Sequence, residues 1–154
     1  MTFNVKIDKK QLSQAQRQIQ NLTDKLKQCA GDSLCAGANR LQDYWQSNGL
    51  WEDTGALRKS GYVECAEVDD GFGAEAHTGF VAPYTVIQEE RHPSNPNYLD
   101  NTYAAALSDI QQEIDNQFVR CLEGQNVDRR YPNFADAQNN FERALDENIE
   151  NGDF

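Results

Sequence analysis

The chain has 154 residues, of which 38% are hydrophobic and 25% charged, and its formal net charge is −11. This length suits one domain, or one domain with an arm. The composition is too apolar for a fully disordered chain and too polar for a membrane protein, and no apolar run approaches the roughly 20 residues of a membrane span. Because the first residues lack the apolar core of a signal peptide, we expect no export.

The negative charge is unevenly distributed along the chain. Residues 1–60 carry nine Lys or Arg and six Asp or Glu, whereas residues 61–90 carry seven acids and no Lys or Arg. A chain with this balance repels nucleic acid overall, so we expect no specific nucleic-acid binding. The acidity indicates a basic partner, or a space through which DNA passes without adhering. Solubility alone explains it equally well.

The N-terminal third predicts a strand and then helix. Residues 3–7 alternate and predict one short strand. Gly31 and Asp32 can end one helix and cap another, although a single kinked helix over 8–46 fits equally well. We expect the apolar stripe of this region to pack on its own domain, because its flanking positions lack the charge pairs that select a coiled-coil partner. The stripe consists of Leu12, Ala15, Ile19, Leu22, Leu26 and Cys29.

The middle of the chain predicts a small sheet. Residues 61–68 form a candidate strand, residues 69–71 carry a turn signal, and residues 72–78 form a weaker second strand. Pro83 can begin a short helix over residues 84–90.

The C-terminal half predicts two helices. Asn95 and Pro96 suit the start of a long helix that ends near Gly124, since apolar residues then recur at spacings of three and four. Residues 134–149 repeat that spacing and are either a docked helix or an arm that orders on a partner. The order of elements predicts an α+β fold: a long N-terminal helix or helix pair, a small antiparallel sheet and a long C-terminal helix. We expect a domain over 1–124 and an acidic extension over 125–154.

The cysteines and histidines do not suggest a metal site. Cys29, Cys35, Cys65 and Cys121 form no CxxC pair, and only two histidines accompany them. Because no export is expected, we predict reduced thiols that are partly buried as small hydrophobic groups.

Catalytic patterns are also weak. His77 and His92 lie in no recognisable nucleophile–base motif. Glu89 and Glu90 are adjacent, so on a helix they point about 100° apart and do not share a face. Gly71 and Gly73 lack the strand–loop–helix context of a phosphate loop. We therefore expect no catalytic residue, metal or cofactor.

Two local segments stand out between these elements. The first runs from Trp51 to Ser60; within it we expect a turn at Gly55, an inward-pointing Leu57, and an Arg58 that stays free for a carboxylate partner. The second runs over residues 80–90 and is followed by a loop that leads into the long helix. Taken alone, each segment is a turn with a buried aromatic residue.

Together, the two segments resemble the head–tail joining, or tail-completion, proteins of long-tailed DNA phages, and the related minor capsid proteins. Members of that family show a long N-terminal helix, then x-T-G-x-L-R-x-S, a short sheet, A-P-Y before a helix with an acidic end, a loop containing Pro, and [F/Y]-L opening the last long helix. An Ile often follows the Ser of the family pattern, where this chain has Gly61. The matching residues, with Trp51 ahead of them, are Thr54, Gly55, Leu57, Arg58, Ser60, Ala82, Pro83, Tyr84, Glu89, Pro96, Tyr98 and Leu99.

The resemblance covers roughly residues 4–120 and implies a non-enzymatic α+β subunit. Such a subunit would form a ring, expected to be a hexamer, in the neck of the virion after assembly in the host cytoplasm. It would contact the head connector or head-closure protein on one side and the tail tube or tail terminator protein on the other, with DNA passing through an acidic lumen. The basic first third and the acidic sheet segment would supply the two different faces of a cyclic interface.

A second hypothesis is an acidic DNA mimic or inhibitor that occupies a basic groove, although the net positive first third argues against it. A small hydrolase is a third, and it would require a polar pocket with a perturbed His or carboxylate.

Overall fold

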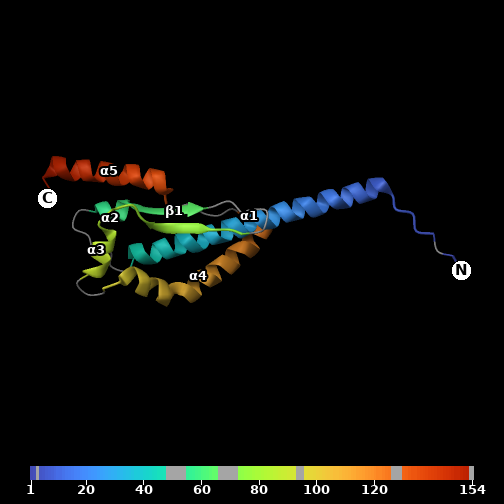
Figure 1. The fold of residues 1–154 in the computed structure, drawn as a ribbon, viewed down its shortest axis with the longest axis horizontal. Coiled ribbons are helices and arrows are strands. Elements are labelled where there is room, and N and C mark those ends of the chain that lie inside the picture. The colour runs from blue at the N-terminus through green and yellow to red at the C-terminus, as the bar shows by residue number, and fades with distance from the viewer. Residues whose placement is uncertain (3, 48–54, 66–72, 93–95, 126–129, 153–154) are drawn as a thin grey trace.

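The computed structural model describes residues 1–2, 4–47, 55–65, 73–92, 96–125 and 130–152. This part of the chain is mostly helical, with a two-stranded antiparallel sheet, which confirms the predicted α+β class (Figure 1). The elements are, in chain order, α1 (Lys9–Ser47), α2 (Ala56–Lys59), β1 (Gly61–Cys65), β2 (Ala76–Phe80), α3 (Thr85–Glu90), α4 (Tyr98–Leu122) and α5 (Phe134–Asn151).

Helix α1 is the central element of the structure. It contacts α4 along one side and both strands along another, as Figure 1 shows for its C-terminal half. It passes through Gly31 without a break, so the single-helix alternative is the one observed. Its close approach to α4 depends on small side chains: a Cβ added at Gly37 would lie 2.6 Å from Cγ1 of Ile114. Even alanine at position 37 would push the two helices apart.

The prediction that the whole apolar stripe packs on its own domain is wrong. Cys29 is buried, but Leu12, Ile19 and Leu22 are 47%, 66% and 57% exposed. The reason is length. The 39 residues of α1 span about 58 Å and the 25 residues of α4 only about 37 Å, so the N-terminal part of α1 extends past its partner (Figure 1).

The predicted strand over residues 3–7 is also wrong for the residues described there. Residues 4–7 are exposed and belong to no strand. The sheet of the described chain contains β1 and β2 only, at a distance from this N-terminal segment (Figure 1). Alternation by itself does not form a strand, because a strand needs a neighbour for its backbone hydrogen bonds.

The second strand of the sheet lies further along the chain than the sequence predicted. β2 covers Ala76–Phe80 instead of residues 72–78, and it pairs so that Gly61 faces Phe80 and Cys65 faces Ala76. The pairing with β1 sets these bounds. Just beyond Phe80, the backbone N–H of Val81 donates to the carbonyl of Ser60 at 2.9 Å and continues the same pairing. The turn signal over residues 69–71 lies outside the described residues.

Two disulfides hold α1 to its neighbours, so the expectation of reduced thiols is wrong. Cys29 bonds to Cys121 at the end of α4, and Cys35 bonds to Cys65 at the end of β1, with Cα–Cα distances of 5.4 and 5.2 Å. These distances lie within the ordinary range for disulfides. The partners of each pair lie far apart in sequence. The packing of α1 between α4 and the sheet brings them together.

The last two helices also differ in detail from expectation. Helix α4 begins at Tyr98 and not at Pro96, because Asn97 adopts a left-handed conformation with φ of 58° and interrupts the helical backbone. Helix α5 docks onto α2 and β1, with Ala137, Phe141 and Ala144 buried. Residues 134–151 are therefore a docked helix; the division of the chain at residue 124 stays a prediction.

Reducing the disulfides should destabilise the protein strongly. The bonds close loops of 92 and 30 residues, for which chain-entropy arguments give about 4.6 and about 3.6 kcal/mol. We expect the double variant Cys29→Ala with Cys121→Ala to lose more stability than Cys35→Ala with Cys65→Ala, measured by urea denaturation without reductant. If added reductant leaves the urea midpoint of the wild type unchanged, the disulfides do not contribute as inferred.

Truncating Phe141 tests whether α5 belongs to the folded body. Because its ring is buried, Phe141→Ala should lower the free energy of unfolding by about 3–5 kcal/mol. Ile149→Ala is the matched control on the same helix, since Ile149 is exposed, and should change stability by less than about 0.5 kcal/mol. Equal effects of the two variants would show that α5 does not dock in solution.

Candidate functional site

The three segments that carry the sequence pattern meet in one hydrophobic cluster. Leu57 from α2, Ala82 from the turn before α3, and Tyr98 from the start of α4 are all buried there. Figure 1 shows α2, α3 and the start of α4 gathered at the end of the molecule opposite the N-terminus. Helix α5 completes the cluster with Phe141 and Ala144.

The first segment forms a tight turn that leads from α2 into the sheet. Gly55 has a φ of 77°, a left-handed conformation that favours glycine. The following turn places Leu57 in the core, where 1% of its surface is exposed. Ser60 is fully buried, and its hydroxyl donates to the carbonyl of Leu57 at 2.7 Å. The Gly, Leu and Ser of this part of the pattern are thus explained by backbone geometry and packing. Trp51 and Thr54 lie outside the described residues.

Arg58 is not free for a partner, contrary to the expectation from sequence. Its guanidinium donates to the backbone carbonyl of Gln46 at 2.6 Å and to the side-chain oxygen of the same residue at 3.1 Å. A cation here meets the negative end of the α1 dipole and one of the carbonyls that the helix leaves unpaired. Arg58 therefore joins α2 to the end of α1, and a change at this position disturbs the fold as well as any interface.

The second segment turns the chain out of the sheet. The carbonyl of Ala82 accepts hydrogen bonds from the backbone N–H and the hydroxyl of Thr85, at 3.1 and 2.6 Å. Pro83 is exposed within this turn. The ring of Tyr84 packs 5.9 Å from that of Phe141, centroid to centroid, and so ties the turn to α5.

The acidic end of α3 organises the start of α4. The carbonyl of Glu89 accepts from the backbone N–H of Asn97 at 2.9 Å, and its carboxylate accepts from that of Asp100 at 3.4 Å. Tyr98 then enters the core with 1% of its surface exposed, 5.0 Å from the ring of His92. Pro96 remains exposed in the preceding turn.

The position after Ser60 requires a small residue in this structure. Gly61 begins β1 directly against α1, and a Cβ there would collide with the side-chain amide of Gln42 and lie 2.7 Å from that of Gln46. Gln42 is fully buried, and its side-chain oxygen accepts from the hydroxyl of Thr78 at 2.8 Å. A branched side chain at position 61 is therefore incompatible with this glutamine.

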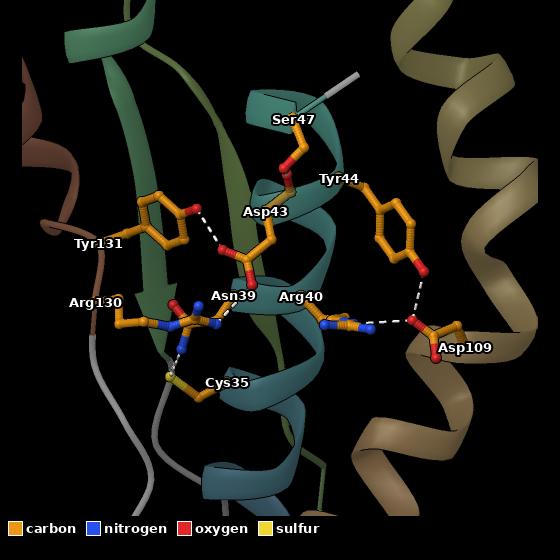
Figure 2. Close-up of polar contacts among 9 residues, drawn as sticks. All are labelled: Cys35, Asn39, Arg40, Asp43, Tyr44, Ser47, Asp109, Arg130 and Tyr131. Carbon is orange, nitrogen blue, oxygen red and sulfur yellow. Dashed lines mark hydrogen bonds and ion pairs between the residues drawn. The ribbon is translucent and has the colours of Figure 1, made fainter. Parts of the chain in front are cut away.

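A row of polar contacts along α1 fastens the elements on either side of it. Figure 2 shows Asp43 pointing toward the loop before α5, where it accepts from the Tyr131 hydroxyl at 2.5 Å and from Arg130 at 2.6 Å. On the other side of α1, Asp109 of α4 accepts from Arg40 at 2.8 Å and from Tyr44 at 2.6 Å.

These contacts shift the protonation equilibria of their members. Burial, reinforced by the hydrogen bond to the Asp43 carboxylate, raises the pKa of Tyr131 well above its ordinary value. Hydrogen bonds from Tyr44 and Arg40 hold the pKa of Asp109 below its ordinary value. Each shift is explained by the partners that fasten α1 to its neighbours, so the shifts describe structural contacts.

The histidines and cysteines take structural positions. His77 is exposed on β2, 3.3 Å from the carboxylate of Glu75, whereas His92 is buried against Tyr98. All four cysteines are used in disulfides. In the described part of the chain, no three His, Cys, Asp or Glu side chains converge in a way that could hold a metal ion. Within the same residues, no helix is long and apolar enough to cross a membrane.

Sequence reasoning missed the contribution of α5 and of the loop before it. Phe141 and Tyr131 contact the cluster and α1, yet they belong to a segment with no place in the family pattern. The helical spacing of Phe134, Ala137, Phe141 and Leu145 was the available signal. It identified an apolar face, but spacing alone does not indicate which surface that face covers.

Comparisons of this chain with protein-family models, with curated proteins and with solved structures found no match.

The Asp43–Tyr131 contact should be visible in the pH dependence of stability. Because folding raises the pKa of Tyr131, its contribution is fully present below the pKa of an unfolded tyrosine, about 10, and is lost as the pH rises further. We expect Tyr131→Phe to be less stable than wild type by about 1.5–3 kcal/mol at pH 7. Measured by urea denaturation, this difference in the free energy of unfolding should shrink above about pH 10.

Tyr103→Phe is the control, because Tyr103 is an exposed tyrosine of α4. Its stability should follow that of the wild type at every pH. A difference between Tyr131→Phe and wild type that stays constant through the alkaline range would contradict the role given to this hydroxyl.

Proposed function

We propose that this chain is a structural, non-enzymatic subunit of a tailed-phage particle that joins the tail to the head. It would form a ring in the neck of the virion, expected to be a hexamer. Its partners would be the head connector or head-closure protein and the tail tube or tail terminator protein, with DNA passing through the ring.

The observation that carries an assembly role is the exposed N-terminal part of α1. We call residues 9–25 the arm; it extends beyond α4 and carries an apolar stripe in which Leu12, Ile19 and Leu22 are about half exposed or more. Exposed apolar surface of this kind marks an interaction site, since leaving it in water is unfavourable. A protein whose longest helix exposes such a stripe is suited to assembly with other chains.

The motif cluster supports the particular kind of assembly. The residues that resemble the tail-completion family lie far apart in sequence, yet Leu57, Ala82 and Tyr98 pack together. The resemblance is therefore to a set of residues that act together in folding.

The charge distribution is compatible with a ring. Subunits of a ring meet through two different surfaces. The arm carries four Lys or Arg and one Asp, whereas residues 98–123 carry five acids and one Arg. Surfaces of opposite sign favour association of one copy with the next in a fixed orientation.

The alternative, an acidic DNA mimic, requires carboxylates spread over the surface that replaces DNA. The arm does not fit that requirement, because its exposed side chains include Lys9, Lys10, Arg17 and Lys25. Tight, salt-sensitive binding to a nucleic-acid enzyme would favour the mimic.

Deleting the gene from the phage that encodes the chain tests the proposal directly. We expect DNA-filled heads and complete tails to accumulate separately, because the joining subunit is absent. Adding the purified protein to a mixture of these heads and tails should restore joined, infective particles, counted by electron microscopy and by plaque titre.

The variant His77→Ala with His92→Ala separates this proposal from a catalytic one. A structural subunit should retain joining activity without these two imidazoles, provided that circular dichroism shows the variant folded. Normal particles from the deletion strain, or protein that sediments with neither heads nor tails, would contradict the proposed function.

A further inference from the structure

We propose that the arm of one copy docks into an apolar groove between α1 and α4 of a second copy. This inference rests on the proposed function, because it names the two surfaces through which copies of the subunit join.

The groove lies next to the Cys29–Cys121 disulfide, where the C-terminal part of α4 meets α1. Leu34 of α1 and Ile114, Phe118 and Val119 of α4 line it, with Ala74 at its edge. Val119 is 54% exposed although it faces this apolar site. Asp115 also lines the groove and places a carboxylate beside the apolar floor.

The arm has the complementary character. Its stripe presents Leu12, Ala15, Ile19 and Leu22 along one side of the helix over about 15 Å. The net charge of residues 9–25 is +3, with Lys9 and Lys25 beside the stripe and Lys10 and Arg17 on the other side of the helix. A basic helix with an apolar face fits a groove with an apolar floor and a carboxylate beside it.

Charge favours an arm in the groove over two arms paired with each other. Two arms paired with each other would bring +3 against +3, whereas an arm laid in the groove meets Asp115 and no Lys or Arg among the lining residues. Like charges disfavour the first arrangement and opposite charges favour the second.

The continuity of α1 makes the contact intermolecular. The arm and Leu34 belong to one unbroken helix, and the arm extends past the end of α4 (Figure 1). It cannot fold back without breaking that helix. Each copy therefore offers one arm and one groove, the two different surfaces from which a ring is built.

Two variants of the full chain test this arrangement. The arm variant carries Ile19→Glu and Leu22→Glu; the groove variant carries Val119→Arg. All three sites are exposed, so the fold should survive, as circular dichroism and thermal melting would verify. Each variant places a charge on an apolar contact. That charge has the same sign as the partner surface and is therefore repelled by it. We expect the dissociation constant for self-association to rise by about tenfold or more, measured by sedimentation equilibrium.

Matched controls carry the same charges elsewhere. Ser13→Glu with Gln14→Glu changes the side of the arm away from the stripe, and Val86→Arg changes an exposed valine of α3 outside the groove. Both should associate like the wild type.

Mixing the arm variant with the groove variant is the decisive experiment. The groove variant still has a normal arm and the arm variant still has a normal groove, so the mixture should form a one-to-one complex that neither protein forms alone. A groove variant that self-associates like wild type would show that arms pair with each other and would overturn the inference. So would a monomeric wild type, or a mixture that remains monomeric.

Failure of this inference can be told apart from failure of the proposed function. A monomeric wild type that still restores the joining of heads to tails would overturn the arm–groove contact alone. A protein that self-associates through arm and groove but does not join heads to tails would overturn the joining role alone.

Discussion

Helix α1 is the element on which every other part of the structure depends. It is held to α4 through the Cys29–Cys121 disulfide and to β1 through the Cys35–Cys65 disulfide, so it is constrained from two sides. The small residues of its central turns allow α4 and the sheet to approach closely. Polar contacts of Asp43 and Asp109 then fix the neighbouring loop and helix in register with it. A two-stranded sheet alone is too small to support a core, which makes this helix indispensable.

The residues of the sequence pattern support this architecture through packing and backbone geometry. Leu57 and Tyr98 fill the core, Gly55 provides a left-handed turn, and Arg58 binds the end of α1. Their tight spacing requirements arise from packing and backbone geometry.

The same length that makes α1 a scaffold also creates its exposed arm. Because α4 is shorter than α1, the apolar stripe continues past the last intramolecular partner. Stability of the single chain cannot account for such a stripe, which contributes little until another surface covers it. The arm is therefore the part of α1 that the fold leaves uncovered, and its basic character contrasts with the acidic composition of the rest of the chain.

The sequence by itself determined the fold class and most helices, because helical spacing and turn residues are local properties. Pro83 predicted α3, and helical periodicity predicted α4 and α5, to within a few residues. Only the tertiary structure decided what each apolar face covers. It paired cysteines 92 and 30 residues apart, placed Arg58 on α1, moved β2 into register with β1, and left Leu12, Ile19 and Leu22 uncovered. Each of these outcomes depends on the relative lengths and distances of elements remote in sequence, and spacing along the chain does not contain that information.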